Sequence, residues 1–283
     1  MLDDRAVGFR GYATKALLYL VMIFLSLLFL FPFYWLFASS LKADQDIFRI
    51  PPVWWPSTPQ FGNYIRAVTL FPFPTYLKNT LVICISTMIG TILSCSLCAY
   101  SLGCVDWPGR NIIFIIIIAI MLMPYTVIMV PVFIIFCRLG WVGTPWPLIV
   151  PAFLATNSFY IFLLRQFFRT LPVELFDAAR IDGASDLYIY GRIVMPLSRT
   201  ALTVVALFQF MGAWNDFMGP LIYLSSADQY TVAVGLHHAL LTRFADWSGL
   251  MAASLLATLP LIFLYFFMQR NFVTGITLTG LNV

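Results

Sequence analysis

Apolar residues run along this chain in long stretches that short polar segments separate. A helix rises about 1.5 Å per residue and the hydrocarbon core of a membrane is about 30 Å thick, so about 20 apolar residues are needed to cross it. Each apolar stretch is close to that length. The pattern therefore predicts six membrane-spanning helices, over about residues 16–38, 77–102, 111–136, 146–168, 201–224 and 249–268.

Proline marks the places where the predicted helices are interrupted or joined. Residues 39–76 are rich in proline and tryptophan, so we expect a folded loop at the membrane–water interface. Residues 103–110 form a short turn. Pro124 and Pro131 lie two helical turns apart in the third apolar run, so we expect them to break it on nearly the same side. Neighbouring protein can satisfy the freed carbonyls, so we expect this helix to pack inside the bundle.

One long polar interval, residues 170–196, interrupts the apolar pattern. Pro172 favours a first helical turn, where its missing N–H leaves no bond unmade. Gly183 can take the left-handed backbone conformation that closes a helix, Ser185 can cap the next helix, and Pro196 would stop it. The interval therefore predicts two short helices around a tight turn.

The first of these short helices has an apolar stripe with small residues at its centre. The stripe follows helical spacing and comprises Leu171, Leu175, Ala178 and Ala179. Acidic Glu174 and Asp177 lie near the amino end of the helix, where the helix dipole is positive. Small residues permit close approach, so we expect another surface to pack against this stripe.

Composition places the chain in a membrane. Of its 283 residues, 61% are hydrophobic and 10% are charged, whereas a soluble domain carries about 25% charged residues. Mean hydropathy is +0.90. The net charge of +4 is too small to indicate a nucleic-acid partner. The five cysteines lie mostly in apolar segments, which argues against a disulfide framework, and the first apolar run is too long for a cleavable signal peptide.

The basic residues predict which side of the membrane each segment faces. With a cytoplasmic amino terminus, the inner segments contain ten of the 16 basic residues: Arg5, Arg10, Lys15, Arg110, Arg165, Arg169, Arg180, Arg192, Arg199 and Arg270. The outer segments contain the other six: Lys42, Arg49, Arg66, Lys78, Arg138 and Arg243. Basic residues favour the cytoplasm. We therefore expect residues 1–15, the loop 170–200 and the tail 271–283 to be cytoplasmic, around a membrane domain of residues 16–270.

The polar interval also carries a spaced set of residues. After Asp177-Ala178-Ala179 come three residues and Gly183, nine residues and Ile193, then one residue and Met195-Pro196. This set resembles the EAA loop of binding-protein-dependent ABC import permeases, which have Glu-Ala-Ala, Gly, Ile and Leu-Pro at these intervals. The replacement of Glu by Asp keeps the charge, and Met replaces Leu. The alternative is an amphipathic loop with no partner, although composition alone would not place glycine, isoleucine and proline at these spacings.

The resemblance implies a mechanical role for the loop. In that family it forms a coupling helix that sits in a cleft of the cytoplasmic ATPase, so that nucleotide-driven closure moves the membrane helices. The residues to which the resemblance gives this ATPase-coupling role are Glu174, Asp177, Ala178, Ala179, Arg180, Asp182 and Gly183.

Further motifs extend the resemblance over most of the chain from Tyr76 onward. They are Met123-Pro124, Val130-Pro131, the Leu-Leu-Arg-Gln-Phe-Phe run at 163–168, and Trp214-Asn215-Asp216-Phe217. These resemble carbohydrate-type permeases, a group that includes the smaller permease of the maltose importer. The resemblance implies an all-helical type I ABC importer permease fold with six transmembrane helices and both termini cytoplasmic, in the inner membrane of a bacterial cell.

The same resemblance implies an assembly and a substrate class. The expected partners are a second homologous permease, an ABC ATPase dimer and a periplasmic or extracellular solute-binding protein, with membrane lipid around the helices. The expected substrate is a sugar or an oligosaccharide. ATP and Mg would be held by the ATPase, and we expect this chain to bind no cofactor.

Polar residues inside the fifth predicted span are candidates for the substrate pathway. An ionised side chain at the centre of a span costs about 2.5–3.5 kcal/mol, so Asp216 needs a reason to be there. Gln209, Gly212 and Ala213 share a helical face with it, and the pathway residues that we predict are Gln209, Trp214, Asn215 and Asp216. An aromatic ring beside amide and carboxylate groups can bind a sugar. The alternative, that these polar groups only join neighbouring helices, is equally open.

The tail and the last outer segment carry weaker signals. Residues 271–280 resemble the family tail that lies against the ATPase dimer, which implies ATPase contacts for Gly275 and Thr277. The outer segment 225–248 corresponds to a loop that in related permeases reaches into the docked binding protein. Its adjacent His237 and His238 point to different helical faces, so we expect no metal site there.

Missing motifs argue against enzymatic activity. A P-loop needs glycine-rich backbone ahead of a lysine, and Lys15, Lys42 and Lys78 follow Thr, Leu and Leu. We therefore expect ATP hydrolysis by a separate subunit. An ion-coupled secondary transporter is the main alternative, but it usually shows internal repeats, which are not evident here. An intramembrane enzyme would need more than a lone Asp216.

Overall fold

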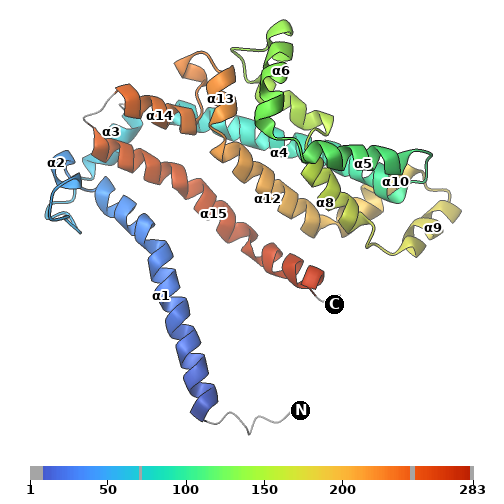
Figure 1. Ribbon diagram of the computed structural model, residues 1–283, viewed down its shortest axis with the longest axis horizontal. Helices are drawn as coiled ribbons and strands as arrows, with labels where there is room; N and C mark the ends of the chain where they lie inside the picture. The colour runs from blue at the N-terminus through green and yellow to red at the C-terminus, as the bar shows by residue number, and fades with distance from the viewer. Residues whose placement is uncertain (1–8, 70–71, 243–245, 281–283) are drawn as a thin grey trace. The chain divides into compact units, whose positions relative to one another are not determined.

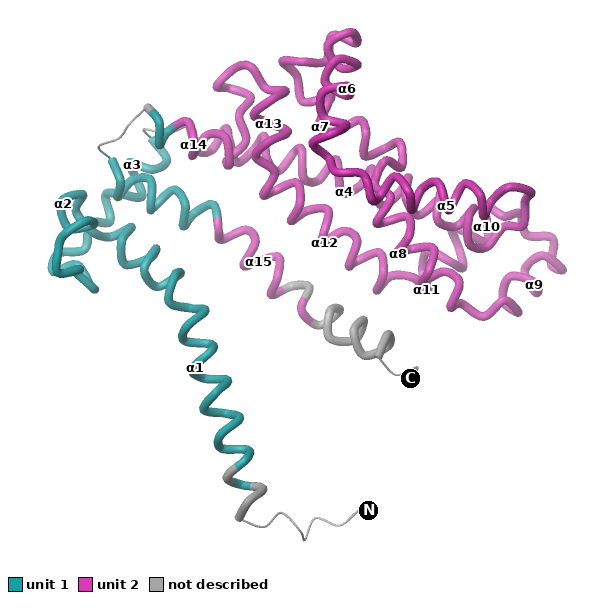
Figure 2. The backbone as a smooth tube through the Cα atoms, viewed as in Figure 1, with its two compact units in different colours: residues 1–71, 239–257 teal, residues 72–238, 258–283 magenta. Residues whose placement is uncertain are grey.

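The computed structural model describes residues 9–69, 72–242 and 246–280, and over these residues the chain is helical with no strand (Figure 1). The side chains at 9–11, 13, 242, 267–268 and 270–280 lie outside the description. The chain divides into two compact units: residues 1–71 with 239–257, and residues 72–238 with 258–283 (Figure 2). The all-helical part of the predicted fold is confirmed for the described residues.

Unit 1 combines a long apolar helix with a folded loop. Its helices are α1 (Phe9–Ser40), α2 (Asp44–Ile47), α3 (Gly62–Thr69), the end of α14 (Val232–Thr242) and the first part of α15 (Trp247–Gly280). The Asn63 amide donates to the carbonyl oxygens of Ser40 and Lys42, at 2.8 and 2.9 Å. The Asp44 carboxylate accepts from both the backbone N–H and the hydroxyl of Ser248, each at 2.8 Å. The loop after α1 is therefore folded, and its place at a membrane surface stays a prediction.

The long side chain of Lys42 is buried in unit 1. Its ammonium lies 3.9 Å from the centroid of the Trp35 ring, over the negative face of the indole. The Ser39 hydroxyl accepts from it at 3.5 Å. Burial lowers the pKa of Lys42, because it disfavours the charged ammonium, while the charge of Asp46 acts in the opposite direction.

Unit 2 is built around α4 (Phe73–Cys104), an unbroken helix against which α8 and α12 pack (Figure 1). Its other elements are α5 (Arg110–Met121), α6 (Tyr125–Arg138), α7 (Trp146–Ile149), η1 (Val150–Leu154), α8 (Ser158–Phe168), α9 (Val173–Ile181), α10 (Asp186–Ile189), η2 (Tyr190–Val194), α11 (Met195–Leu197), α12 (Arg199–Asn215), α13 (Met218–Tyr223), η3 (Ala227–Gln229), the first part of α14 (Val232–Thr242) and the last part of α15. Here η2 is a π-helical segment, and η1 and η3 are 3-10 helices.

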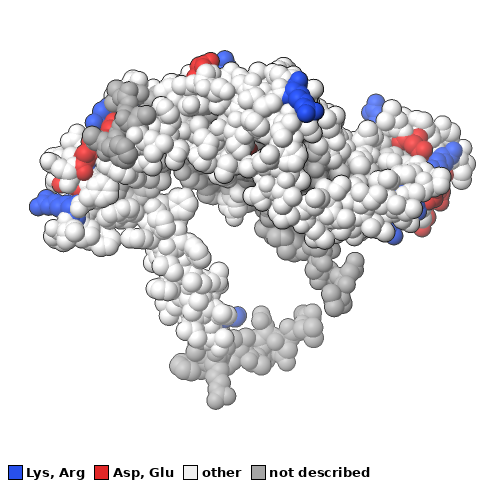
Figure 3. Space-filling model, turned by 45° about the horizontal axis from the view of Figure 1, so that its top comes forward, with Lys and Arg blue, Asp and Glu red and all other residues white. Residues whose placement is uncertain are grey.

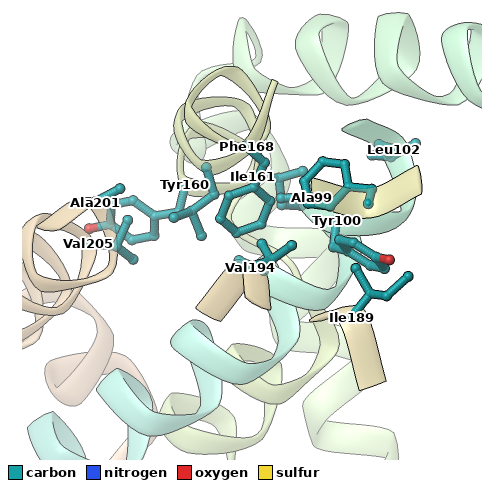
Figure 4. Packing of buried hydrophobic residues seen from close by; sticks show 13 residues of the cluster. Ala99, Tyr100, Leu102, Tyr160, Ile161, Phe168, Ile189, Val194, Ala201 and Val205 are labelled. Atoms are coloured by element: carbon teal, nitrogen blue, oxygen red, sulfur yellow. The ribbon is translucent and has the colours of Figure 1, made fainter. Parts of the chain in front are cut away.

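A cluster of buried apolar side chains holds these helices together (Figure 4). Tyr100 of α4, Ile161 of α8, Val194 of η2 and Val205 of α12 meet there. Phe176 adds α9 to the same cluster. Phe176 lies outside the predicted spans, so its burial contributes about 1.5–3 kcal/mol and makes the loop 170–198 part of the fold of unit 2.

The helices agree only in part with the six predicted membrane crossings, and the fifth differs because α12 ends at Asn215 and not near Leu224. Within the described part of the chain, four segments are long and apolar enough to cross a membrane: Thr14–Ser40, Phe73–Cys104, Trp146–Phe168 and Trp247–Phe266. Two bent pairs could each make a further crossing: Arg110–Met121 with Tyr125–Arg138, bent by 102°, and Asp186–Leu197 with Arg199–Asn215, bent by 80°. The count of six and the side on which the termini lie stay predictions.

The third predicted span differs from its expected form. Pro124 immediately precedes α6, at the sharp bend, because its ring is incompatible with an uninterrupted helix. Pro131 lies inside α6, so the second predicted break is wrong. Within this chain α5 has no buried residue and α6 has only Phe136, so the expectation that this segment packs inside the bundle is wrong for the chain by itself.

Candidate functional site

The loop 170–198 forms the helix, turn and helix that its sequence predicts. Gly183 has φ +80°, and its N–H donates to the carbonyl oxygen of Arg180 at 3.0 Å. The N–H of Ala184 donates to the carbonyl oxygen of Ala179 at 2.9 Å. These two bonds make a Schellman ending, which a left-handed glycine completes. The Ser185 hydroxyl accepts from the Tyr188 N–H at 3.3 Å, which confirms the predicted cap.

The two prolines of this loop act differently from the prediction. Pro172 has ψ 123° and precedes the first turn of α9 as its cap residue. Pro196 lies within α11, so it does not stop the second helix. The helical run continues through the π-helical η2 to Leu197, and the chain bends by 80° after Ser198. Pro196 lies where the π-helical η2 passes into α11, so the helical hydrogen-bond pattern is already irregular at its missing N–H.

The helix α9 packs through one face and presents the other. Phe176 is buried and Ala179 packs partly against the same core, whereas Leu175 and Ala178 are exposed. Of the predicted apolar stripe, Leu171 and Ala179 therefore pack within the chain, and the packing of another surface against Leu175 and Ala178 stays a prediction. The exposed residues of α9 and the following turns are Val173, Glu174, Leu175, Asp177, Ala178, Arg180, Ile181, Asp182, Gly183, Ser185, Asp186, Leu187 and Tyr188.

This exposed face of α9 mixes large apolar side chains with charges. Ile181 is 86% exposed and Leu187 is 69% exposed, which is unusual beside so large a buried cluster. Acidic and basic residues gather at this end of unit 2 (Figure 3). An exposed apolar patch with a charged rim is typical of a protein interaction site.

A cavity of about 270 Å³ lies at the other end of α12. Its lining comprises Ile83, Thr87, Leu148, Gln209, Gly212, Ala213, Asp216 and Pro220. The predicted common face of Gln209, Gly212, Ala213 and Asp216 is thereby confirmed. The cavity offers hydroxyl, amide and carboxylate groups between apolar walls.

The structure does not bring all the predicted pathway residues together. Trp214 is 5% exposed and stacks on Phe210 at 5.7 Å between ring centroids, in an apolar cluster with Cys84. It does not line the cavity. Asn215 is exposed, and its amide donates to the carbonyl oxygen of Met211 at 2.9 Å.

Asp216 has a local structural role that sequence reasoning missed. It follows the last residue of α12, and its Oδ1 accepts from the Gly219 N–H at 3.1 Å, in the first turn of α13. A Cβ on Gly219 would lie 2.5 Å from Asp216 Oδ2, so glycine is needed for this approach. The carboxylate thus satisfies a backbone donor where the helix is interrupted. The sequence signal for this hydrogen bond is an aspartate three residues before a glycine.

Two substitutions at Asp216 distinguish the effect of its hydrogen bond to the Gly219 N–H from the effect of its negative charge. Asp216→Asn keeps an acceptor for the Gly219 N–H, so we expect a folded chain with nearly normal uptake, because a neutral sugar does not require a carboxylate. Asp216→Ala removes the cap, which costs about 0.5–2 kcal/mol, so we expect a lower melting temperature of the purified chain. Loss of uptake by a stable Asp216→Asn chain would show that the charge itself serves transport.

The predicted tail contacts cannot be placed by their side chains. The backbone of α15 runs through Gly275 and Thr277, but both side chains lie outside the described part of the chain.

His237 lies against the Phe217 ring, with 5.0 Å between ring centroids. Among the described residues, no three His, Cys, Asp or Glu side chains form a group that could hold a metal ion.

These features are those of a helical membrane protein with an exposed helix–turn–helix loop, and comparison with known proteins identifies its family. The chain belongs to the family of binding-protein-dependent transport system inner membrane components, whose model matches residues 96–278. The chain is 33% identical to the arabinooligosaccharides transport system permease protein AraQ of Bacillus subtilis, over 97% of each chain. It is 32% identical to the trehalose/maltose transport system permease protein MalG of Thermococcus litoralis, over 95% of this chain and 97% of that one. The predicted family is confirmed.

A solved structure shows the same fold. A chain of a bacterial ABC transporter involved in the import of the acidic polysaccharide alginate superposes with a TM-score of 0.79. The two sequences are 24% identical, and the match covers 95% of this chain and 99% of the other. The helices therefore have the arrangement of an ABC importer permease.

Proposed function

We propose that this chain is the transmembrane permease subunit of an ATP-driven importer for sugars or oligosaccharides. The observation that carries the proposal is the exposed face of α9 on a chain of this family. Ile181 and Leu187 are exposed beside the acidic side chains of Glu174 and Asp177. A separate ATPase that binds ATP and Mg would cover this face, and its closure would displace α9.

The substrate class follows from the relatives and from the cavity. The relatives named above transport arabinooligosaccharides and trehalose or maltose, as their names state. Thr87, Gln209 and Asp216 offer this cavity hydrogen-bonding groups that match sugar hydroxyls. Because the cavity has apolar walls as well, it can also contact the apolar faces of a sugar ring.

The proposed assembly has four kinds of component. This chain would pair with a second homologous permease, bind an ATPase dimer through α9, and receive substrate from a solute-binding protein outside. A structural relative was solved in complex with an alginate pentasaccharide-bound periplasmic protein. The excess of basic residues in the proposed inner segments, ten against six, supports cytoplasmic termini in a bacterial inner membrane. Family membership argues against an ion-coupled secondary transporter.

Co-purification tests this assembly. The chain is extracted from native membranes in mild detergent, and the proteins and small molecules that accompany it are identified by mass spectrometry. We expect an ATPase, a second permease and a retained sugar. A chain that comes out alone or as a homo-oligomer, and that transports in vesicles without ATP, would overturn the proposal in favour of a secondary transporter.

A further inference from the structure

Arginine side chains bind two segments to the carboxyl end of α4. The segments are α8 and the loop 170–198, which is called the coupling loop from here on. Arg180 of α9 donates from Nη2 to the carbonyl oxygen of Cys104 at 3.3 Å. Arg165 of α8 donates from Nε to the carbonyl oxygen of Leu102 at 3.0 Å. The last carbonyls of a helix have no partner within the helix and carry partial negative charge. Guanidinium groups are therefore well matched to this end of α4.

The same helix end holds α5 as well. Arg110 donates from Nη1 to the carbonyl oxygen of Val105 at 2.9 Å. Arg165 is 6% exposed, and its guanidinium lies 3.7 Å from the centroid of the Phe114 ring of α5. Three elements, α5, α8 and α9, thus meet at one set of carbonyls.

A stripe along α4 holds the second half of the coupling loop. Ser96, Tyr100 and Cys104 recur every four residues, so they share one face of α4. The Ser96 and Tyr190 hydroxyls are hydrogen-bonded at 2.7 Å. The Tyr100 hydroxyl donates to Asp186 Oδ1 at 3.5 Å, and the Tyr100 and Tyr190 rings pack with centroids 5.5 Å apart. The loop is attached to α4 at three successive turns, beside the apolar contacts of Figure 4.

The helix α4 also reaches the polar cavity. Ile83 and Thr87 line that cavity, and Cys104 lies 17 residues beyond Thr87, about 25 Å along a helix. The helix is continuous between these points. The chain also connects the loop to the cavity in both directions along the sequence, but neither connection is one continuous helix. Toward the carboxyl end, the chain bends by 80° between α11 and α12. Toward the amino end, it leaves helical geometry at Ala155, before α8. The stiffest connection from loop to cavity is therefore α4.

We infer that α4 is the lever that transmits the displacement of α9 to the cavity, and that Arg180 is the positioning residue that joins α9 to it. This inference rests on the proposed function of α9 as the contact of an ATPase. Arg180 also pairs with Asp177 and Asp186, each at 3.5 Å, so its guanidinium links both halves of the loop to α4. Arg180 thus acts through contacts within the permease. The neighbouring exposed residues of α9 would make the contact with the ATPase.

The test measures coupling in the complete transporter reconstituted in vesicles. The probe is whichever of malto-, arabino- and chito-oligosaccharides gives the fastest wild-type uptake, and the readout is the number of sugars moved per ATP hydrolysed. Arg180→Gln should lower this ratio by roughly fivefold or more, the lower range of typical coupling effects, while ATP hydrolysis continues. Arg180→Lys, which keeps a cationic donor, should restore much of the ratio. Arg192→Gln changes another exposed arginine of the loop and should leave the ratio unchanged.

A milder variant guards against a simple folding defect. Tyr190→Phe removes only the hydroxyl that bonds to Ser96, and it should lower the ratio to a smaller extent at a normal yield of assembled transporter. Wild-type ratios in Arg180→Gln and Tyr190→Phe would overturn the inference and leave the proposed function intact. Parallel loss of assembly, ATP hydrolysis and uptake in Arg180→Gln, with no effect of Tyr190→Phe, would reduce Arg180 to a structural role. No ATP-dependent uptake by the wild type would overturn the proposed function itself.

Discussion

Replacement of Gly183 by valine should abolish uptake while the chain stays in the membrane. Gly183 has φ +80°, where a residue other than glycine costs about 1–3 kcal/mol, and a β-branched residue fits worst. No heavy atom lies within 4 Å of a Cβ at this position, so the effect acts through the backbone. The turn would reopen and change the angle between α9 and α10. Uptake and ATP hydrolysis by reconstituted vesicles measure the result.

Asparagine at the same position is the matched control. Asparagine tolerates the left-handed conformation better than other side chains, and the space around Gly183 is open. Gly183→Asn should therefore keep a large part of the uptake. Unchanged uptake in Gly183→Val would contradict the coupling role of the loop, and equal loss in both variants would indicate that a side chain itself blocks the docking surface.

Introduction of tryptophan at Gly212 should close the substrate path. Gly212 lines the cavity of about 270 Å³, and no heavy atom lies within 4 Å of a Cβ there, so a side chain at this position starts in open space at the cavity wall. We expect uptake to fall by roughly tenfold or more, since each 1.4 kcal/mol or so added to the barrier is a factor of ten. Size-exclusion chromatography measures assembly with the partner subunits, which should stay normal.

Two controls show whether the cavity is the cause. Gly212→Ala adds a single methyl group and should transport nearly normally. Met211→Trp places the same bulk on the preceding residue, which is exposed and does not line the cavity, and should have little effect. Normal uptake in Gly212→Trp would show that substrate takes another route.

Local sequence signals predicted much of the structure of the loop 170–198, because its turn depends on neighbouring residues only. Gly183 and Ser185 act where their backbone and side-chain chemistry requires. The packing face of α9 was not predictable in this way. Leu175 and Phe176 are both apolar, and the choice of Phe176 as the buried one depends on the core that α4 and α8 provide.

The cavity shows the same division. Helical periodicity alone placed Gln209, Gly212 and Ala213 on one face. It could not show that Trp214 points into an apolar cluster, since that depends on Cys84 of α4 and on the stacking with Phe210.

By itself the sequence determined that this is a membrane protein, with apolar runs long enough to cross a bilayer and a glycine-closed loop between two of them, and the permease assignment came from the resemblance of that loop to a known family. Run length and turn chemistry are local properties, so they can be read without a fold. Only the tertiary structure decided where the runs bend, that Asp216 caps the start of α13, and that Arg180 turns toward the carbonyls of α4. Each of these depends on which segments meet in space, and unpaired backbone groups at those meetings determine which polar side chains are needed.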